Sequence, residues 1–347
     1  RLYIYCIDQN QEVKMKKTIC IILTLALIVV MCLGCMAGCN QDDGNTIKLI
    51  EVTHSVFYAP LYVAIDGGYF KEEGIEIKLS NGGGADKCMT SIIAGQSDIG
   101  LMGPEAAIYI ANEGRADYPV IFAQLTKKDG SFLMARQPNE NFSWADIAGK
   151  NVIGGRKGGV PAMALEYAIK KAGLVDGKDY TLNFDVQFDL IGPAFEGGTG
   201  DYCTMFEPSA SAMQDAGKGY IVASVGEQAG DMPFTAFMAT KSYMQKNSDK
   251  VEKFTKAIIK AMDFVNTHSA EEVAKVLAPS FVGTSQESLA TAIQAYKDID
   301  AYSTTPIMKE EDFNLLQDVI IEAGVMTKKA DFAKLFDGSV AQKILNK

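Results

Sequence analysis

The sequence predicts an α/β protein built of two lobes. Short apolar runs, each suited to one strand, alternate with stretches of helical periodicity. Four prolines follow such runs at the points where helical stretches begin. The body of the chain, about 300 residues, also exceeds the size that a single hydrophobic core comfortably reaches, so we expect two cores.

The first element is a secretion signal. Residues 15–17 are a charged start (Met-Lys-Lys), residues 19–30 are almost entirely apolar, and small residues precede Cys39. This order is typical of a bacterial lipoprotein signal peptide. We expect the signal region 1–39, starting at Met15, to be cleaved before Cys39, whose thiol then receives lipid chains. The protein would lie outside the cytoplasm, lipid-anchored to the bacterial membrane.

Two alternatives to this interpretation stay open. The apolar stretch, about 18 residues long, is just sufficient for a membrane-spanning helix. Cys35 is a second candidate for lipidation. The polar residues 40–45 favour cleavage, because they are suited to a tether between the lipid and the body.

Composition limits the classes of partner. Without the signal region, the net charge of −10 becomes about −12, which argues against nucleic acid and anionic membrane surfaces. Cys88 and Cys203 are the two cysteines behind the signal, and their apolar surroundings favour free thiols over one disulfide. With two histidines in the whole chain and no CxxC pair, a metal site is not expected.

The body begins with strand-and-helix units. The predicted strands are residues 48–52, 75–79, 98–102, 151–153 and 201–205. Helices are predicted to end at Asp66, before Gly95 and at Asn112, and further helices to span residues 249–268, 286–297 and 309–323. The apolar stripes of the last three are expected to face a core.

The junctions between strands and helices share one feature, a proline soon after the strand: Pro60, Pro104, Pro161 and Pro208. Proline is tolerated at the first helical position, where its missing N–H would have no partner. Helix N-termini at the carboxyl ends of strands form the edge where open α/β sheets bind ligands. A ligand cleft is therefore expected at this edge.

The usual enzyme motifs are absent. The stretch 82–87 lacks the third glycine of a dinucleotide fingerprint, and the chain has neither a GxxxxGK[ST] loop nor a GxSxG elbow. His54 and Ser55 are adjacent, and neighbouring side chains on an extended segment point in opposite directions. We therefore expect a protein that is not an enzyme and uses no cofactor.

Several of these segments resemble one family. Residues 58–75 (YAPLYVAIDGGYFKEEGI), 93–100 (IAGQSDIG), 147–152 (IAGKNV) and 206–208 (FEP) look like the solute-binding proteins of ABC importers for nitrate, aliphatic sulfonates, taurine or the pyrimidine precursor of thiamine. The resemblance runs over residues 46–240, with a weaker continuation. It implies the type II periplasmic-binding-protein fold, in which two lobes joined by two crossing strands close on the ligand.

The resemblance also implies where the lobes and the site lie. Lobe one would comprise residues 46–128 and 232–347, and lobe two residues 129–231. The ligand would contact His54, Ser55, Phe57, Tyr58, Gly83, Gly84, Ala85, Met102, Gly103, Glu105, Gly158, Gly159, Val160, Phe206 and Glu207. The fungal pyrimidine-synthesis relatives carry a cysteine-rich site that this chain lacks, which also argues against an enzyme.

Two classes of ligand stay open. Helix N-termini suit an oxyanion such as sulfonate, taurine or nitrate, and Arg156 and Lys157 could neutralise it unless they are a solvated loop edge. Glu105 and Glu207 would repel an anion, however. Aromatic side chains near them favour a heteroaromatic ligand such as a thiamine-type pyrimidine.

The function expected from these observations is a monomeric, lipid-anchored receptor that binds a small nutrient and delivers it to an ABC permease and its ATPase. A sensor on the same scaffold, which signals to a partner outside the cytoplasm, is the alternative class.

Overall fold

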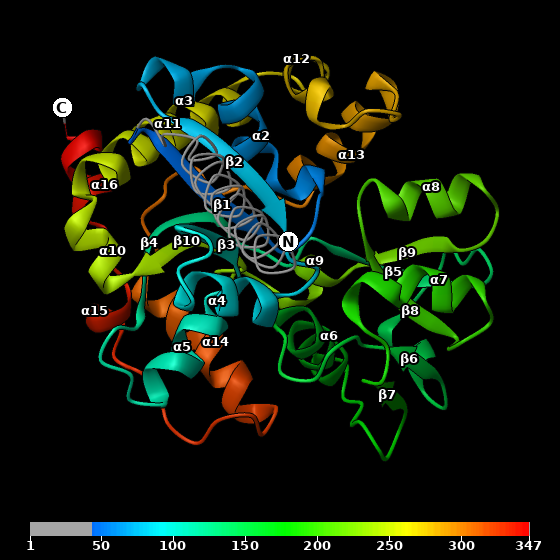
Figure 1. Ribbon diagram of the computed structural model, residues 1–347. Coiled ribbons are helices and arrows are strands. Elements are labelled where there is room, and N and C mark those ends of the chain that lie inside the picture. Colours follow the sequence, from blue (N-terminus) through cyan, green and yellow to red (C-terminus); the bar gives the residue numbers. More distant parts are fainter. Residues whose placement is uncertain (1–43, 347) are drawn as a thin grey trace, which may run out of the picture. The chain divides into compact units, whose positions relative to one another are not determined.

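The computed structural model describes residues 44–346 (Figure 1). The secretion signal, Cys39 and residues 40–43 of the tether lie outside the described residues and stay predictions. From Asn45 onward the chain forms one compact unit. Among the described helices, none combines the length and apolar character that crossing a membrane requires.

One sheet has five strands in the order β2-β1-β3-β10-β4. The strands are β1 (Thr46–Glu51), β2 (Glu76–Asn81), β3 (Ile99–Met102), β4 (Pro119–Thr126) and β10 (Thr235–Thr240). β1 pairs in parallel with β2 and β3, and Leu49 lies between Leu79 and Ile99. β10 runs antiparallel to both of its neighbours. The strands predicted at 48–52, 75–79 and 98–102 are thereby confirmed, with ends shifted by one or two residues.

A second sheet also has five strands, in the order β7-β6-β8-β5-β9. The strands are β5 (Ser131–Ala135), β6 (Asn151–Ile153), β7 (Thr181–Asn183), β8 (Tyr202–Phe206) and β9 (Tyr220–Ser224). β6 pairs in parallel with β7 and β8, whereas β5 is antiparallel to β8 and β9. Sequence periodicity detected β6 and β8 and missed β5, β7 and β9.

The chain passes between the two sheets twice, at residues 127–130 and 225–234. The second passage contains a helix, α9 (Val225–Ala229), in place of a continuous strand. Where the passages meet, a Cβ atom on Gly226 would lie 2.1 Å from the carbonyl oxygen of Asp129, so glycine is required. The two-lobed α/β fold with two crossings, which the resemblance implied, is confirmed.

Helices surround the sheets. Those of the first lobe are α2 (Ala59–Asp66), α3 (Tyr69–Glu72), α4 (Ala85–Ile93), α5 (Glu105–Asn112), α10 (Lys241–Lys246), α11 (Ser248–Thr267), α12 (Ala270–Leu277), α13 (Gln286–Asp298), α14 (Glu310–Glu322), α15 (Phe332–Leu335) and α16 (Ser339–Leu345). Figure 1 shows α2, α3 and α11 on one side of the first sheet and α4, α5 and α14 on the other. The second lobe has α6 (Val160–Lys171), α7 (Ile191–Glu196) and α8 (Ser209–Asp215), besides α9.

The three long helices predicted near the C-terminus are confirmed as α11, α13 and α14. Their apolar faces are buried, as expected: Phe254 of α11, for example, contacts the ring of Phe237 edge to face at a centroid distance of 5.0 Å. The described residues also form short 3₁₀ helices: η1 (Val56–Tyr58), η2 (Trp144–Ile147), η3 (Phe188–Leu190) and η4 (Ala278–Ser280).

The four prolines all mark helix starts, although not in one position. Pro60 and Pro161 lie in the first turn of α2 and α6, whereas Pro104 and Pro208 occupy the cap position before α5 and α8. A cap residue also leaves its N–H outside the helical hydrogen bonds, so proline fits there equally well.

Cys88 lies in α4 of the first lobe and Cys203 in β8 of the second. Both are buried free thiols, as predicted. Burial raises the pKa of the Cys88 thiol to about 12.

Candidate functional site

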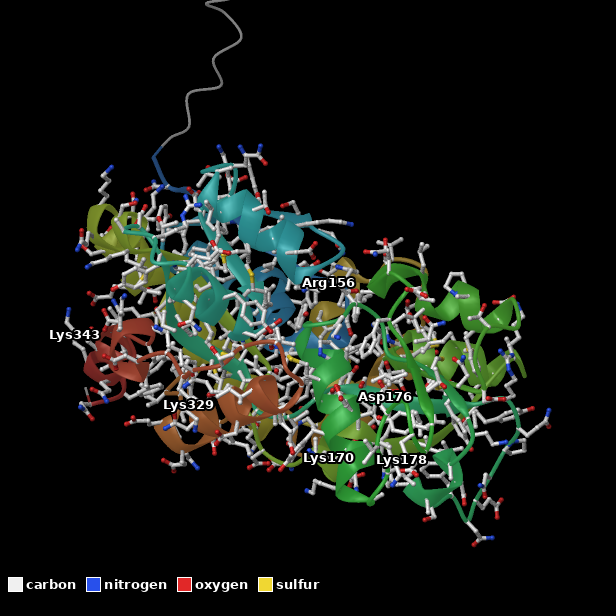
Figure 2. The ribbon with its side chains drawn as sticks, turned by 90° about the horizontal axis from the view of Figure 1, so that it is seen from below. Arg156, Lys170, Asp176, Lys178, Lys329 and Lys343 are labelled. Carbon is white, nitrogen blue, oxygen red and sulfur yellow. The ribbon has the colours of Figure 1, made fainter. Side chains whose placement is uncertain are left out.

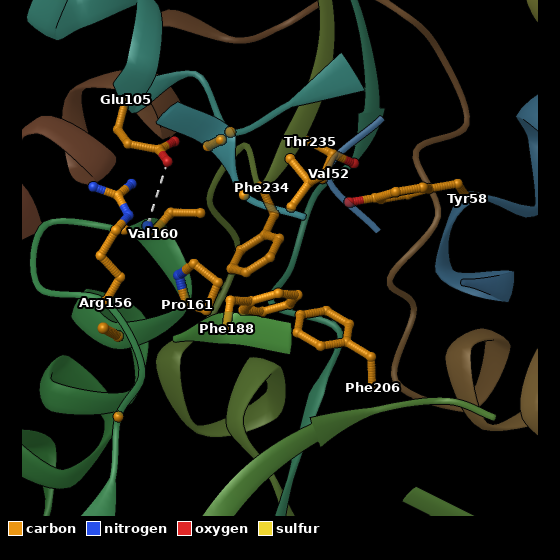
Figure 3. A pocket seen from close by; sticks show the side chains of 16 residues that line it. Val52, Tyr58, Glu105, Arg156, Val160, Pro161, Phe188, Phe206, Phe234 and Thr235 are labelled. Carbon is orange, nitrogen blue, oxygen red and sulfur yellow. Dashed lines mark hydrogen bonds between the residues drawn. The ribbon is translucent and has the colours of Figure 1, made fainter. Parts of the chain in front are cut away.

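A cavity lies where the two lobes face each other (Figure 3). Its walls come from helix starts and strand ends of both lobes, as the junction pattern predicts. The lining residues are Val52, Tyr58, Gly84, Ala85, Gly103, Glu105, Gly154, Arg156, Gly159, Val160, Pro161, Ala162, Phe188, Phe206, Phe234 and Thr235.

Aromatic rings form one side of the cavity. Phe206 at the end of β8 contacts Phe188 of η3 and Phe234 of the second crossing, with ring centroids 5.7 and 6.3 Å away. Figure 3 shows these three rings close together, with the hydroxyl group of Tyr58 pointing toward the cavity from another wall. Behind them, the fully buried Phe57 contacts Phe206 at 5.4 Å and supports the wall from the core. Such a surface suits the faces and edges of a planar ring.

One carboxyl group faces this apolar wall. Glu105 begins α5 in the first lobe and is 1% exposed. Its Oε1 atom accepts a long hydrogen bond, 3.4 Å, from the backbone N–H of Val160, the first residue of α6 in the second lobe. Its Oε2 atom is buried and has no hydrogen-bond partner among the described residues.

Burial raises the pKa of Glu105 to about 7, because the charged form loses its contact with water. Backbone N–H groups of Glu105, Val160 and Ala106 and the charge of Arg156 act in the opposite direction. The carboxyl group therefore changes its protonation near neutral pH.

Gly103 makes room for this carboxyl group. A Cβ atom at position 103 would lie 1.9 Å from Oε2 of Glu105. Any larger residue would displace the carboxyl group from its place over the backbone of the β3–α5 turn. The glycine is thus explained by the position of the acid.

Arg156 lines the cavity and approaches the opposite lobe; Figure 2 labels it where the lobes face each other. It belongs to the loop between β6 and α6, and its Nε atom lies 3.6 Å from Oδ1 of Asp86 in α4. Lys157, which the sequence paired with it, instead lies over the ring of Phe184, 5.8 Å from its centroid. Of the two cations, Arg156 alone is part of this cavity's lining.

A second cavity adjoins the first and contains three further predicted residues, His54, Ser55 and Glu207. The Ser55 hydroxyl donates to the carbonyl oxygen of Glu207 at 2.6 Å. Both carboxyl oxygens of Glu207 are engaged by Ser211, by its N–H at 3.0 Å and its hydroxyl at 2.7 Å. Burial raises the pKa of Glu207, and the bonds from Ser211 oppose that shift.

His54 uses both ring nitrogens within the protein. Nδ1 lies 3.1 Å from Oε1 of the buried Glu51, and Nε2 lies 2.8 Å from the carbonyl oxygen of Ser280. The ring also stacks on Phe281 at 4.5 Å. The bond to Glu51 raises the pKa of His54, since the carboxylate favours the imidazolium.

The structure thus divides the predicted site residues between two cavities and their surroundings. The main cavity receives Tyr58, Gly84, Ala85, Gly103, Glu105, Gly159, Val160 and Phe206. The second cavity receives His54, Ser55 and Glu207, and shares Phe206. Neither cavity is lined by Phe57, Gly83, Met102 or Gly158.

Those four lie nearby in other roles. Phe57 and Met102 are fully buried, in the core and in β3. Gly83 has a left-handed backbone at φ 65° in the turn before α4. The carbonyl oxygen of Gly158 accepts a hydrogen bond from the Tyr109 hydroxyl of the other lobe at 2.8 Å.

Sequence reasoning missed several lining residues, above all Phe188 and Phe234. Phe188 lies in an irregular segment with no strand or helix pattern. Phe234 lies two residues beyond the lobe boundary predicted at residues 231–232. Crossings between lobes lie close to the cleft, so this boundary could have indicated Phe234 as a lining residue. The aromatic wall therefore depends on segments whose local patterns are weak.

Known proteins are similar to this chain in sequence or in fold. The family described as "NMT1/THI5 like" matches residues 56–272. A curated relative, the putative binding protein YtlA of Bacillus subtilis, is 42% identical over 310 residues, which cover 89% of this chain and 93% of the relative.

Solved structures are similar in fold at low sequence identity. The alkanesulfonate-binding protein SsuA of Xanthomonas axonopodis bound to MOPS has a TM-score of 0.68 at 15% identity, covering 84% of this chain and 98% of that protein. The nitrate-binding protein NrtA of Synechocystis has a TM-score of 0.68 at 15% identity, covering 87% and 88%. The ligand-binding component of an ABC-type import system from Staphylococcus aureus has a TM-score of 0.67 at 11% identity, covering 86% and 98%. These likenesses establish the fold.

Proposed function

Since this chain belongs to the NMT1/THI5-like family, whose members include binding proteins, we propose that it is the receptor of an ABC importer. It binds a small organic ligand between its lobes and delivers it to a permease and its ATPase. The curated relative is described as a putative binding protein, and solved relatives are described as binding alkanesulfonate and nitrate, which supports the binding of a small molecule. Delivery to a permease is a further part of the proposal.

The ligand is a planar heteroaromatic molecule, such as a thiamine-type pyrimidine. The observation that carries this proposal is the pairing of an aromatic wall with one buried acid. Phe188, Phe206 and Phe234 offer ring faces and edges, and Glu105 offers an acceptor across the cavity. Ligand sites are commonly apolar with a few polar groups that fix orientation.

An oxyanion is the second candidate. Three helix N-termini, those of α4, α5 and α6, adjoin the cavity, and the structural relatives named above include proteins described as binding alkanesulfonate and nitrate. Two of those N-termini already carry acids, Asp86 and Glu105, and the third is approached by Glu105. A second negative charge there would be repelled unless Glu105 is protonated. This charge distribution favours the heteroaromatic ligand.

The proposal includes the location. Cleavage before Cys39 and lipidation of that residue would hold the receptor on the outer side of the bacterial membrane, where a permease can receive the ligand. The receptor acts as a monomer. If the same scaffold instead serves a sensor, the neighbouring genes would lack a permease and an ATPase, which a survey of the genomic context would reveal.

Native mass spectrometry of gently purified protein tests the ligand class directly. A copurified mass matching an intact pyrimidine or related heteroaromatic compound would support the proposal. Recovery of a sulfonate or nitrate would replace it with the second candidate. Conversion of an added compound by the purified protein would contradict a receptor role altogether.

A further inference from the structure

Glu105 has two carboxyl oxygens with different surroundings. Oε1 approaches the N–H of Val160, whereas Oε2 is buried without a partner among the described residues. A buried polar atom without a hydrogen bond typically costs about 1–3 kcal/mol. The atom lies over Gly103, and both residues line the main cavity. A ligand that donates a hydrogen bond there would remove this cost.

The other oxygen joins the two lobes. Val160 is the first residue of α6, a helix of 12 residues whose first turn has no acid of its own. An unbonded N–H at a helix start carries partial positive charge, and Glu105 supplies the complementary carboxylate from the opposite lobe. In Figure 3 the dashed line between these residues crosses from one lobe to the other.

We infer that Glu105 couples ligand recognition to lobe closure: Oε1 caps α6 across the cleft while Oε2 accepts a hydrogen bond from an N–H group of the ligand. This inference rests on the proposed function and deepens it. The Glu105 side chain would select ligands that have an N–H donor. It would also make the contact that stabilises the closed form of the two lobes.

The coupling follows from the geometry of one rigid group. The two oxygens belong to a planar carboxyl, so a hydrogen bond that orients Oε2 also orients Oε1 toward Val160. The 3.4 Å contact is long for an N–H···O bond. A donor at Oε2 would hold the carboxyl ionised and in place, and the contact with α6 would shorten.

Glu105→Gln separates the two roles. The amide oxygen can still accept from Val160, but the atom that faces the cavity becomes an NH₂ donor. Calorimetry at about pH 8, above the pKa of about 7 of Glu105, would compare 4-aminopyrimidine, unsubstituted pyrimidine and methanesulfonate. The wild-type protein should bind 4-aminopyrimidine best. The variant should lose at least about tenfold in affinity for it and change its affinity for pyrimidine by less than about threefold.

Gly103→Ala and Glu105→Ala test closure. The alanine methyl at position 103 would push the carboxyl group aside while leaving its charge in place, and only a side-chain end has to move. Both variants should shift the unliganded and 4-aminopyrimidine-bound forms toward a larger radius of gyration in small-angle scattering, whereas Glu105→Gln should remain compact. Glu113→Gln, at the exposed end of the same helix, is the matched control and should behave as wild type.

The outcomes separate the inference from the function on which it rests. If the wild-type protein binds methanesulfonate and not 4-aminopyrimidine, the heteroaromatic proposal and this inference both fail. If it binds 4-aminopyrimidine but Glu105→Gln binds equally well, the proposed function stands and the inference is overturned. Unchanged scattering of both alanine variants, with circular dichroism confirming their folding, would likewise overturn the closure role.

Discussion

The hydroxyl group of Ser55 in the first lobe donates a hydrogen bond of 2.6 Å to the backbone carbonyl oxygen of Glu207 in the second. The same hydroxyl accepts the N–H of Phe57 at 3.2 Å and so caps η1. Ser55 is 2% exposed. One buried oxygen atom therefore serves both local structure and the contact between lobes.

Ser55→Ala should lower the free energy of unfolding by about 2–3 kcal/mol. The cap contributes about 1 kcal/mol, and the buried carbonyl of Glu207 would lose a donor. Urea denaturation followed by circular dichroism measures the change. Ser269→Ala, which removes an exposed cap of α12, is the control and should cost only about 1 kcal/mol. Equal losses in the two variants would show that the interlobe bond contributes nothing.

Phe206→Leu should weaken binding of 4-aminopyrimidine by about tenfold, since the ring that contacts both Phe188 and Phe234 is lost while apolar bulk is kept. Calorimetry measures the affinity. Phe142→Leu changes an aromatic side chain in the same lobe that contacts Trp144 and Tyr202, away from the cavity, and should leave the affinity unchanged. An unaltered affinity in the Phe206 variant would argue against stacking in this cavity.

Asp129 at the first crossing should make stability depend on pH. It is fully buried, and burial raises its pKa from 3.8 to about 7. Between these values the folded protein holds a proton that the unfolded chain has lost, so the free energy of unfolding falls as pH rises. Each pKa unit corresponds to about 1.36 kcal/mol, so the total is a few kcal/mol.

Asp129→Asn should flatten that decline, so the variant gains stability relative to wild type between about pH 4 and 7. Urea midpoints at a series of pH values provide the measurement. The exposed Asp231 on the second crossing provides the control variant, Asp231→Asn, which should retain the wild-type slope. Parallel curves for wild type and Asp129→Asn would refute the assignment.

His54 should make stability depend on pH in a different pH range from Asp129. Its pKa is raised by the bond to Glu51, so the stabilisation is fully present below the unfolded value of 6.5 and is lost as pH rises through the folded value. His54→Gln should therefore destabilise the protein more at acidic than at alkaline pH. Urea midpoints of this variant and of His268→Gln, the other histidine of the chain, would be compared. A difference that grew with pH would contradict the pairing with Glu51.

Cys39→Ser should abolish lipidation. The protein expressed with its signal would then remain in the aqueous phase on partitioning with detergent, whereas wild type enters the detergent phase. Cys35→Ser is the matched change four residues earlier and should still partition with detergent. The reverse pattern would identify Cys35 as the acceptor.

Much of the fold could be predicted because it follows from local periodicity. The strand at 151–153 and the helices α11, α13 and α14 were located within two residues, since alternating or helical apolar patterns record which face is buried. Periodicity did not predict β4, β5, β7, β9 or β10. β7 and β9 are short strands of intermediate burial, which carry little pattern, whereas β4 and β5 are buried at every position and so show no alternation.

The candidate site was predictable only in outline. Prolines and glycines at strand ends predicted a cleft at the carboxyl edge of the strands. The family resemblance implied the individual residues, and of these Tyr58, Gly84, Gly159 and Phe206 line the main cavity. The same reasoning treated Glu105 and Glu207 alike, as acids at helix starts.

The sequence by itself determined the α/β class, the junctions that face the cleft and the family to which the chain belongs. Only the tertiary structure decided which acid is left with an unbonded oxygen. Ser211, four residues away, engages both carboxyl oxygens of Glu207, whereas Oε1 of Glu105 accepts from Val160, 55 residues away in the other lobe, and Oε2 has no partner among the described residues. Contacts between residues so far apart in the chain depend on how the two lobes meet. No local pattern in the sequence shows how they meet.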